Sequence, residues 1–186
     1  VAIRFPLSSS GIDEDGCPSG CPSLSTGCYP YLDDWLVHAP SQNQLLRELE
    51  LVCRCLQEHG FLLNENKCNL IPSQDLIFIG ARFRTDLNQV FLPDSRVATL
   101  VRLVSAVVNS QSVSVRELLR LQGYMAASVF TVPWSRFHLR PLWFHLHAHW
   151  NVTTGSYEDM VPVTQSIARE LSWWLEPLNL LKGVHL

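Results

Sequence analysis

The chain has 186 residues, 47% hydrophobic and 17% charged, which is enough to bury the core of one ordinary domain or two small ones. It has no apolar run long enough to span a bilayer and no signal peptide, so we expect an intracellular protein, cytoplasmic or nuclear, without a membrane partner. The net charge of −3 is unevenly spread, with ten acidic and four basic residues in 1–75 but eight arginines against three acids in 76–140.

Residues 1–28 are rich in Ser, Gly, Pro and Cys and show no periodicity, so we expect an irregular segment. Its acidic run, Asp13-Glu14-Asp15, is more typical of a solvated loop than of a metal site. The six cysteines of the chain fit no zinc-module spacing, and we expect them to be reduced thiols.

Residues 29–37 (Tyr-Pro-Tyr-Leu-Asp-Asp-Trp-Leu-Val) predict a tight β-hairpin with two carboxylates at its tip, because apolar and aromatic runs flank a short polar pair. Adjacent carboxylates repel each other unless a cation lies beside them. Oxygen ligands of this kind suit Mg²⁺, with Mn²⁺ as a possible substitute, so Asp33 and Asp34 are candidate metal ligands. Taken alone, Asp-Asp is more simply a turn.

A helix is predicted next, because Leu45, Leu49, Val52 and Leu56 recur at helical spacing before Gly60. Residues 76–83 then read as one strand, which a turn near residues 86–88 joins to residues 90–92 in a second hairpin. A glycine inside that strand, Gly80, suggests a close approach of the backbone to another group.

Helices are predicted again from residue 94 onward. One spans 94–108, and the next begins at Ser114, where Ser114 and Glu117 have the spacing of a capping box, and ends before Pro133. In the aromatic stretch 134–150, three histidines alternate (His145, His147, His149). They would share a face and could bind a metal on a strand, but they diverge on a helix, which we favour. A short helix near 167–175 follows.

In this order, the motifs resemble the reverse transcriptase of retroelements, most closely the tyrosine-recombinase (DIRS-type) class. The resemblance runs from about Gly27 to the C-terminus, and its motifs are Tyr31 to Val37, His59-Gly60-Phe61 with Asn64 and Lys67, Leu70 to Gln74, Phe78-Ile79-Gly80, Leu92-Pro93, Leu121 to Ala127, Leu139 to Leu142, and Trp173-Trp174.

The resemblance implies an α+β fold. A partial reverse-transcriptase palm of two β-hairpins and a helix would occupy residues 29–92. A helical thumb would occupy 93–132, and a connection-like helical segment 133–186, stopping before any ribonuclease H domain.

The resemblance also implies residue roles. Asp33 would bind the metal, Asp34 would support it, and Lys67 would assist at the pyrophosphate or a proton. Residues implied to contact nucleic acid are Tyr31, Phe78, Ile79, Gly80, Arg82, Arg84, Arg102, Arg116 and Arg120. The arginine-rich middle agrees with a thumb that follows a duplex backbone, although a solvated basic helix face explains the charge equally well.

In the full-length parent, the implied reaction is two-Mg²⁺ nucleotidyl transfer from dNTP on an RNA or DNA template-primer duplex. That chemistry needs a carboxylate from an earlier palm strand, and residues 1–28 do not resemble that strand or the fingers. We therefore expect a reverse-transcriptase fragment that is inactive as this chain. The alternatives are a non-catalytic nucleic-acid- or protein-binding module, and a translation product without selected function.

Overall fold

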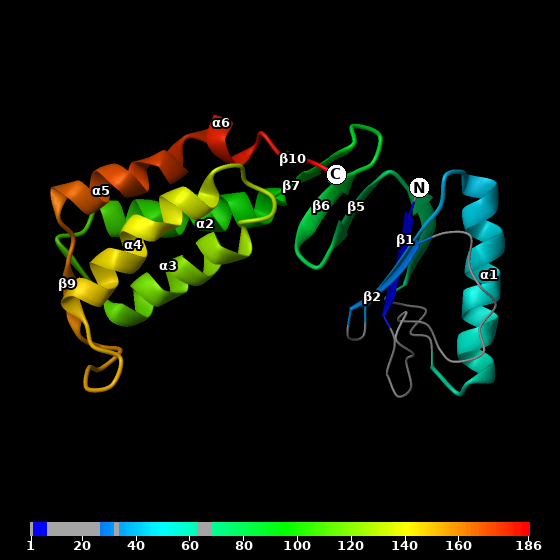
Figure 1. The fold of residues 1–186 in the computed structure, drawn as a ribbon, viewed down its shortest axis with the longest axis horizontal. Helices are drawn as coiled ribbons and strands as arrows, with labels where there is room; N and C mark the ends of the chain where they lie inside the picture. The colour runs from blue at the N-terminus through cyan, green and yellow to red at the C-terminus, as the bar shows by residue number, and fades with distance from the viewer. Residues whose placement is uncertain (1, 7–26, 32–33, 63–67) are drawn as a thin grey trace. The chain divides into compact units, whose positions relative to one another are not determined.

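The computed structural model describes residues 2–6, 27–31, 34–62 and 68–186, with the backbone alone for residues 2–6. The chain divides into two compact units, Val1–Asn88 and Gln89–Leu186 (Figure 1). The first contains a four-stranded sheet, one helix and a further β-hairpin, and the second is mainly helical. The mixed α+β class predicted from the sequence is confirmed, whereas its division into palm, thumb and connection stays a prediction.

The sheet of the first unit contains β2 (Gly27–Tyr31), β3 (Asp34–His38), β1 (Ala2–Pro6) and β4 (Asn69–Ser73), in that order across the sheet. Strands β2 and β3 pair antiparallel, with Tyr31 opposite Asp34, so the two predicted hairpin strands are confirmed. The two residues between them, Leu32 and Asp33, lie outside the described residues.

Strand β1 corrects the prediction that residues 1–28 lack regular structure. Its five residues pair antiparallel with β3 over its full length, from Ala2 opposite His38 to Pro6 opposite Asp34. On its other side β1 pairs with β4. A short strand whose partners lie far along the chain leaves little local signal, because its stability comes from the neighbouring strands rather than from its own composition.

Helix α1 (Gln42–Glu58) covers one face of this sheet (Figure 1). Ser41 begins the helix, because its side chain accepts a hydrogen bond of 3.3 Å from the backbone N–H of Gln44. The predicted apolar face of α1 is confirmed, because its four aliphatic residues are buried in one cluster with two residues of β3. The helix residues are Leu45, Leu49, Val52 and Leu56, and the strand residues are Trp35 and Val37.

Strands β5 (Asp75–Phe78) and β6 (Ala81–Arg84) form an antiparallel hairpin. The prediction of one continuous strand over residues 76–83 is therefore wrong. The chain reverses at Ile79 and Gly80, whose φ angles are 42° and 81°. Two successive residues with positive φ make a tight hairpin turn, and an Ile in that conformation is rare enough to hide the turn in the sequence. Gly80 thus supplies a turn rather than a close approach within a strand.

The second unit packs helices around one core. Its elements are β7 (Gln89–Phe91), α2 (Asp94–Val108), β8 (Ser112–Ser114), α3 (Val115–Ala127), α4 (Ser135–His149), β9 (Met160–Pro162), α5 (Gln165–Ser172), the 3₁₀ turn η2 (Trp173–Leu175), α6 (Pro177–Leu180) and β10 (Val184–His185). Strand β7 pairs with β10, and β8 pairs with β9.

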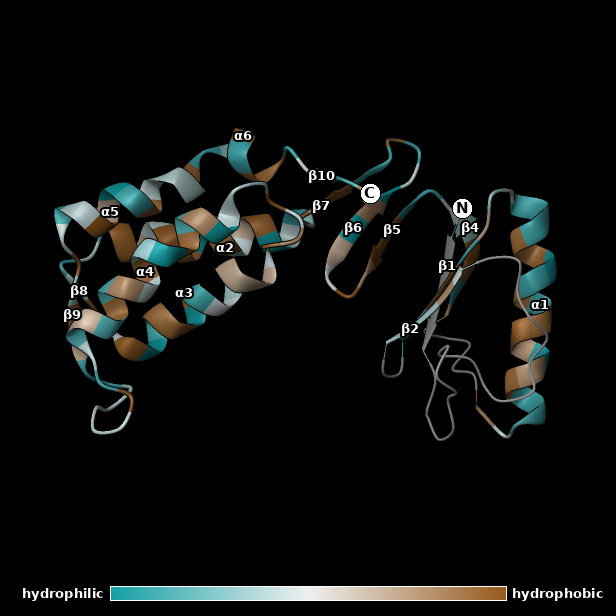
Figure 2. Cartoon of the chain, viewed as in Figure 1, coloured by the Kyte–Doolittle hydropathy of each residue, from teal (hydrophilic) through white to brown (hydrophobic). Residues whose placement is uncertain are grey.

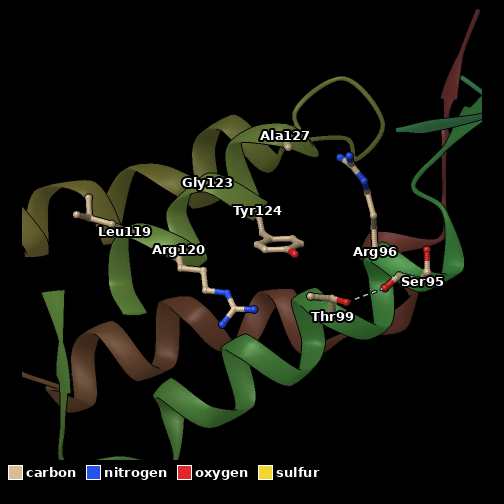
Figure 3. Close-up of a pocket in the computed structure, with 8 residues that line it drawn as sticks. All are labelled: Ser95, Arg96, Thr99, Leu119, Arg120, Gly123, Tyr124 and Ala127. Atoms are coloured by element: carbon tan, nitrogen blue, oxygen red, sulfur yellow. Dashed lines mark hydrogen bonds between the residues drawn. The ribbon is translucent and has the colours of Figure 1, made fainter. Parts of the chain in front are cut away.

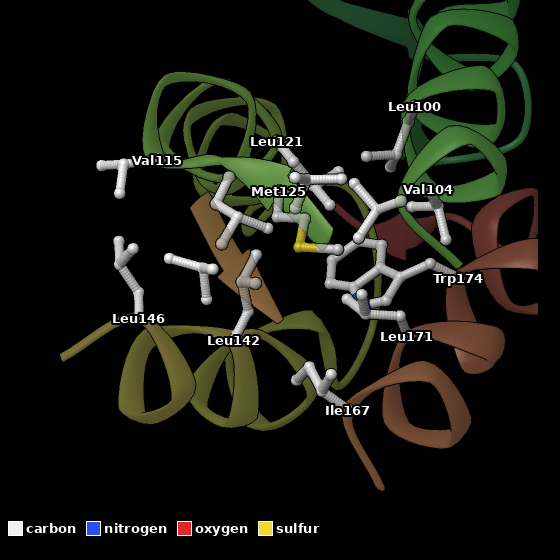
Figure 4. Packing of buried hydrophobic residues seen from close by; sticks show 14 of the residues in the cluster. Leu100, Val104, Val115, Leu121, Met125, Leu142, Leu146, Ile167, Leu171 and Trp174 are labelled. Carbon is white, nitrogen blue, oxygen red and sulfur yellow. The ribbon is translucent and has the colours of Figure 1, made fainter. Parts of the chain in front are cut away.

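The core of the second unit joins the two segments that the sequence divides into thumb and connection. Met125 of α3, Leu142 of α4 and Trp174 of η2 are fully buried in one cluster (Figure 4). Figure 2 shows the apolar residues of these helices in brown, interleaved with polar residues in teal. Helices α2 to α5 therefore form one packed body.

The cysteines partly depart from expectation. Cys28, Cys53 and Cys68 carry free thiols, half-buried against the α1 core. Burial raises the pKa of the Cys53 thiol, and Cys68 adds to this shift, so Cys53 stays protonated near neutral pH. Cys55 is disulfide-bonded, so the expectation of reduced thiols is wrong at that position.

The predicted capping box at the start of α3 is present. The Ser114 hydroxyl accepts from the Glu117 N–H at 3.3 Å, and the Glu117 carboxylate accepts from the Ser114 N–H at 3.1 Å. Replacing Ser114 by Ala should lower the free energy of unfolding by about 1 kcal/mol, measured by urea denaturation. Ser112→Ala is the matched control, because Ser112 is exposed on β8 and caps no helix. Equal stability of the two variants would contradict the assigned cap.

Candidate nucleic-acid interface

Asp34 lies where three neighbouring strands, β2, β3 and β1, end side by side. Asp34 is half-buried as the first residue of β3, opposite Tyr31 on β2 and Pro6 on β1. Tyr31 is exposed. Asp33 and Lys67, the other two predicted catalytic residues, lie outside the described residues. Of the three predicted catalytic residues, Asp34 is therefore the one that the structure describes.

For a divalent cation at this end of the sheet, the predicted ligand that the structure describes is Asp34. Asp34 is a half-buried residue at a strand end, and Mg²⁺ takes one or two protein carboxylates and keeps several waters. Within the described ranges, no three His, Cys, Asp or Glu side chains gather as a metal site. A two-ion clamp needs carboxylates from separate strands, and the described residues do not supply them.

The β5–β6 hairpin carries five of the predicted nucleic-acid contacts, in differing environments. Phe78 is 4% exposed and packs in a cluster with Leu36 and Leu76, whereas Ile79 is exposed at the turn beside Gly80. The remaining two are arginines. Phe78 therefore supports the hairpin from within, and Ile79 is presented to solvent.

Arg82 and Arg84 are each held by a carboxylate. Arg82 donates from Nε and Nη2 to the two carboxylate oxygens of Asp75, at 2.8 and 2.7 Å. Arg84 holds Asp86 in the same way, at 2.9 and 2.7 Å. These hydrogen bonds hold the pKa of both carboxyl groups below the ordinary value. To bind a phosphate, each guanidinium group would first have to break its bidentate ion pair.

Arg116 is also engaged, and Arg102 is exposed on α2. Arg116 donates from Nε to Glu158 at 2.9 Å, and its guanidinium carbon lies 5.9 Å from the centre of the Tyr157 ring. This pair joins the start of α3 to the segment before β9. Three of the five predicted arginine contacts are thus occupied by neighbouring carboxylates.

A groove between α2 and α3 presents arginines without such partners. It has a volume of about 510 Å³, and the residues that line it are Ser95, Arg96, Thr99, Leu119, Arg120, Gly123, Tyr124 and Ala127. In the view of Figure 3, the Tyr124 ring lies between the Arg96 and Arg120 side chains. In the described part of the chain, neither arginine forms an ion pair with a carboxylate. The groove therefore carries two positive charges that no described carboxylate neutralises.

Small side chains keep this groove open on the α3 side. Gly123 and Ala127 are exposed on α3, and a Cβ built on Gly123 would have no atom within 4 Å. On α2, the Thr99 hydroxyl donates to the Ser95 carbonyl at 2.9 Å, so it is satisfied within the helix. An elongated polyanion could approach the helix backbone here while guanidinium groups contact its phosphates.

Sequence reasoning named Arg120 but missed Arg96 and Tyr124. Arg120, Gly123, Tyr124 and Ala127 stand at i, i+3, i+4 and i+7, so they share one face of α3. Arg96 and Thr99 share a face of α2 in the same way. The sequence signal for this groove was therefore an arginine at helical spacing from small residues on the same helix face. A count of arginines alone does not reveal that spacing.

The three alternating histidines lie on α4, as the helical interpretation predicted. The His145 ring Nε2 is 2.8 Å from the Pro162 carbonyl, and the His149 Nδ1 is 2.8 Å from the His145 carbonyl. His147 packs edge-on against Trp143. Each ring thus has a structural contact.

No protein-family model and no characterised protein sequence matches the chain. The solved structures that match include three of a foamy viral protease-reverse transcriptase, which cover all of the chain at 16–17% sequence identity and TM-scores of 0.67–0.68. One is the form designated dRH bound to double-stranded DNA, one holds an RNA/DNA hybrid and one holds double-stranded DNA. The chain folds like part of a reverse transcriptase. It spans 36%, 28% and 42% of those three chains.

No helix in the described part of the chain is long and apolar enough to cross a membrane.

Gly123 lies inside α3, where glycine costs stability relative to alanine. Because a Cβ there meets open space, Gly123→Ala should raise the free energy of unfolding by about 0.5–1 kcal/mol, measured by urea denaturation. Gly155→Ala is the contrasting variant, since its Cβ would clash with the Trp150 ring, and it should destabilise. A destabilising Gly123→Ala would mean that α3 packs more closely at this face than described.

Proposed function

We propose that this chain is part of the reverse transcriptase of a retroelement and that the α2–α3 groove binds the backbone of a nucleic-acid duplex. One observation carries the proposal: Arg96 and Arg120 line an open groove and pair with no described carboxylate. The fold supports it, because the similar viral structures are complexes with double-stranded DNA or an RNA/DNA hybrid.

Electrostatics favour these two arginines over those predicted on β6 and at the start of α3. A free guanidinium that contacts a phosphate releases condensed counterions, which supplies most of the non-specific affinity for a duplex. Arg82, Arg84 and Arg116 must first lose a carboxylate partner. Since an exposed ion pair contributes about 0–1 kcal/mol, that loss is modest but offsets part of the gain.

On the palm side, we propose that Asp33 and Asp34 bind Mg²⁺ in the full-length parent, with Lys67 near the pyrophosphate. Bound Mg²⁺ would supply charge stabilisation for nucleotidyl transfer from a dNTP. The half-buried position of Asp34 at a strand end supports a carboxylate reachable by a hydrated ion. The order of motifs from Tyr31 to Trp174 favours the DIRS-type class as the finer assignment.

The alternative is a non-catalytic nucleic-acid-binding module. It is favoured by the second unit, which has its own core and contains every residue that lines the α2–α3 groove. Binding by that unit would need no chemistry at the hairpin. The two candidates differ in what the loss of Asp33 would do.

The binding proposal predicts that Arg96→Gln combined with Arg120→Gln weakens binding to a primer-template duplex. The dependence of log affinity on log salt should become shallower by about 1 for each lost contact. Fluorescence anisotropy with a labelled duplex, titrated at several salt concentrations, measures both quantities.

The control for this experiment is Arg82→Gln combined with Arg116→Gln, which removes the same charge from arginines that are already paired. It should change affinity much less. If the two double variants lose affinity equally, total charge rather than the groove explains the binding.

The catalytic proposal predicts no primer extension by this 186-residue chain with Mg²⁺ or Mn²⁺. Upstream of the hairpin its acids are Asp13, Glu14 and Asp15, which do not resemble a catalytic palm strand. In a longer protein that supplies the earlier strand and the fingers, extension should appear, and Asp33→Ala should abolish it. Extension by the 186-residue chain that Asp33→Ala abolishes would overturn the prediction.

A further inference from the structure

Large aromatic side chains are exposed around the junction of α3 and α4. Phe130, Trp134 and Phe137 are 76%, 77% and 68% exposed. Soluble domains normally bury such rings, and exposed clusters of them mark interaction sites. A second groove, about 720 Å³ in volume, lies at these residues within the second unit. It shares no lining residue with the α2–α3 groove.

The lining of this groove is basic as well as aromatic. Arg136, Lys182 and His185 contribute to it, and none of the lining residues is acidic. The Arg136 guanidinium carbon lies 5.9 Å from the centre of the Phe130 ring, so this cation already rests over an aromatic face. A polyanion that also offers flat rings complements both features.

The backbone holds Trp134 in an unusual conformation. Its φ angle is 65°, in the left-handed region that large residues rarely adopt. The Trp134 carbonyl accepts from the N–H groups of Phe137 and His138 as α4 begins, at 2.9 and 3.3 Å. A strained residue that presents its ring to solvent is typical of ligand sites.

We infer that this second groove binds a single-stranded segment of nucleic acid, with bases stacked on Trp134 and Phe137 and phosphates near Arg136 and Lys182. A single strand offers unstacked base faces, which a duplex does not. An apolar protein partner would match the rings but not a basic, acid-free lining. This site is separate from the α2–α3 groove, and different residues line it.

The test is anisotropy of a fluorescent oligothymidylate of about 12 nucleotides with the full chain. Trp134→Asn removes the ring without adding backbone strain, because Asn tolerates the left-handed region. It should weaken binding about tenfold, the loss expected from one stacked base. Phe137→Ala should act in the same direction, and Trp134→Phe should retain most of the affinity.

The matched control is Phe144→Ala, which removes an exposed ring from the same helix outside the groove. It should bind as the unaltered chain does, and circular dichroism should show all variants folded. Arg96→Gln with Arg120→Gln should spare binding of the oligothymidylate, so the two sites fail separately.

Three results would overturn the inference. The first is no binding of the oligothymidylate by the unaltered chain. The second is unchanged affinity in both folded ring-removal variants, Trp134→Asn and Phe137→Ala. The third is self-association of the chain that Trp134→Asn abolishes without affecting oligothymidylate binding, which would identify a protein-binding surface instead.

Discussion

The burial of β3 on both faces is the constraint on which the first unit is built. Side chains alternate along a strand, so Trp35 and Val37 pack against α1, while Leu36 packs against the β5–β6 hairpin. A shift of one residue in the pairing would exchange these faces and expose the wrong side chains. The place of Asp34, one residue before this run, therefore follows from the packing of its neighbours along β3.

Features with a local cause were predictable from the sequence, and features with a distant cause were not. The apolar face of α1 and the capping box at Ser114 depend on residues within a turn or two of each other. Strand β1 depends on β3 and β4, which lie far along the chain. The turn at Ile79 and Gly80 was hidden for another reason, since Ile is a strong strand former placed in a conformation that it rarely adopts.

The arginine-rich middle shows why charge counts locate an interface poorly. The Arg116 partner is Glu158, 42 residues away, so no local reading of the sequence would pair them. Arg84, in contrast, pairs with Asp86 only two residues on. What distinguishes Arg96 and Arg120 is not their number but their position on facing helices beside small residues. The sequence was thus enough to indicate the arginine-rich region and Arg120, whereas the pairing of Arg116 with Glu158 required the tertiary structure.

Both grooves of the second unit occupy positions where the chain gives up stability. Gly123 costs about 1 kcal/mol relative to alanine inside α3, although its Cβ would meet nothing. Leaving a Phe or Trp ring in water forgoes roughly 1.5–3 kcal/mol of burial, while Met125 and Trp174 already fill the core. Departures from local stability are expected where binding requires them. They fall at a groove with two guanidinium groups and at a groove with exposed rings, which matches the duplex site and the single-strand site proposed for them.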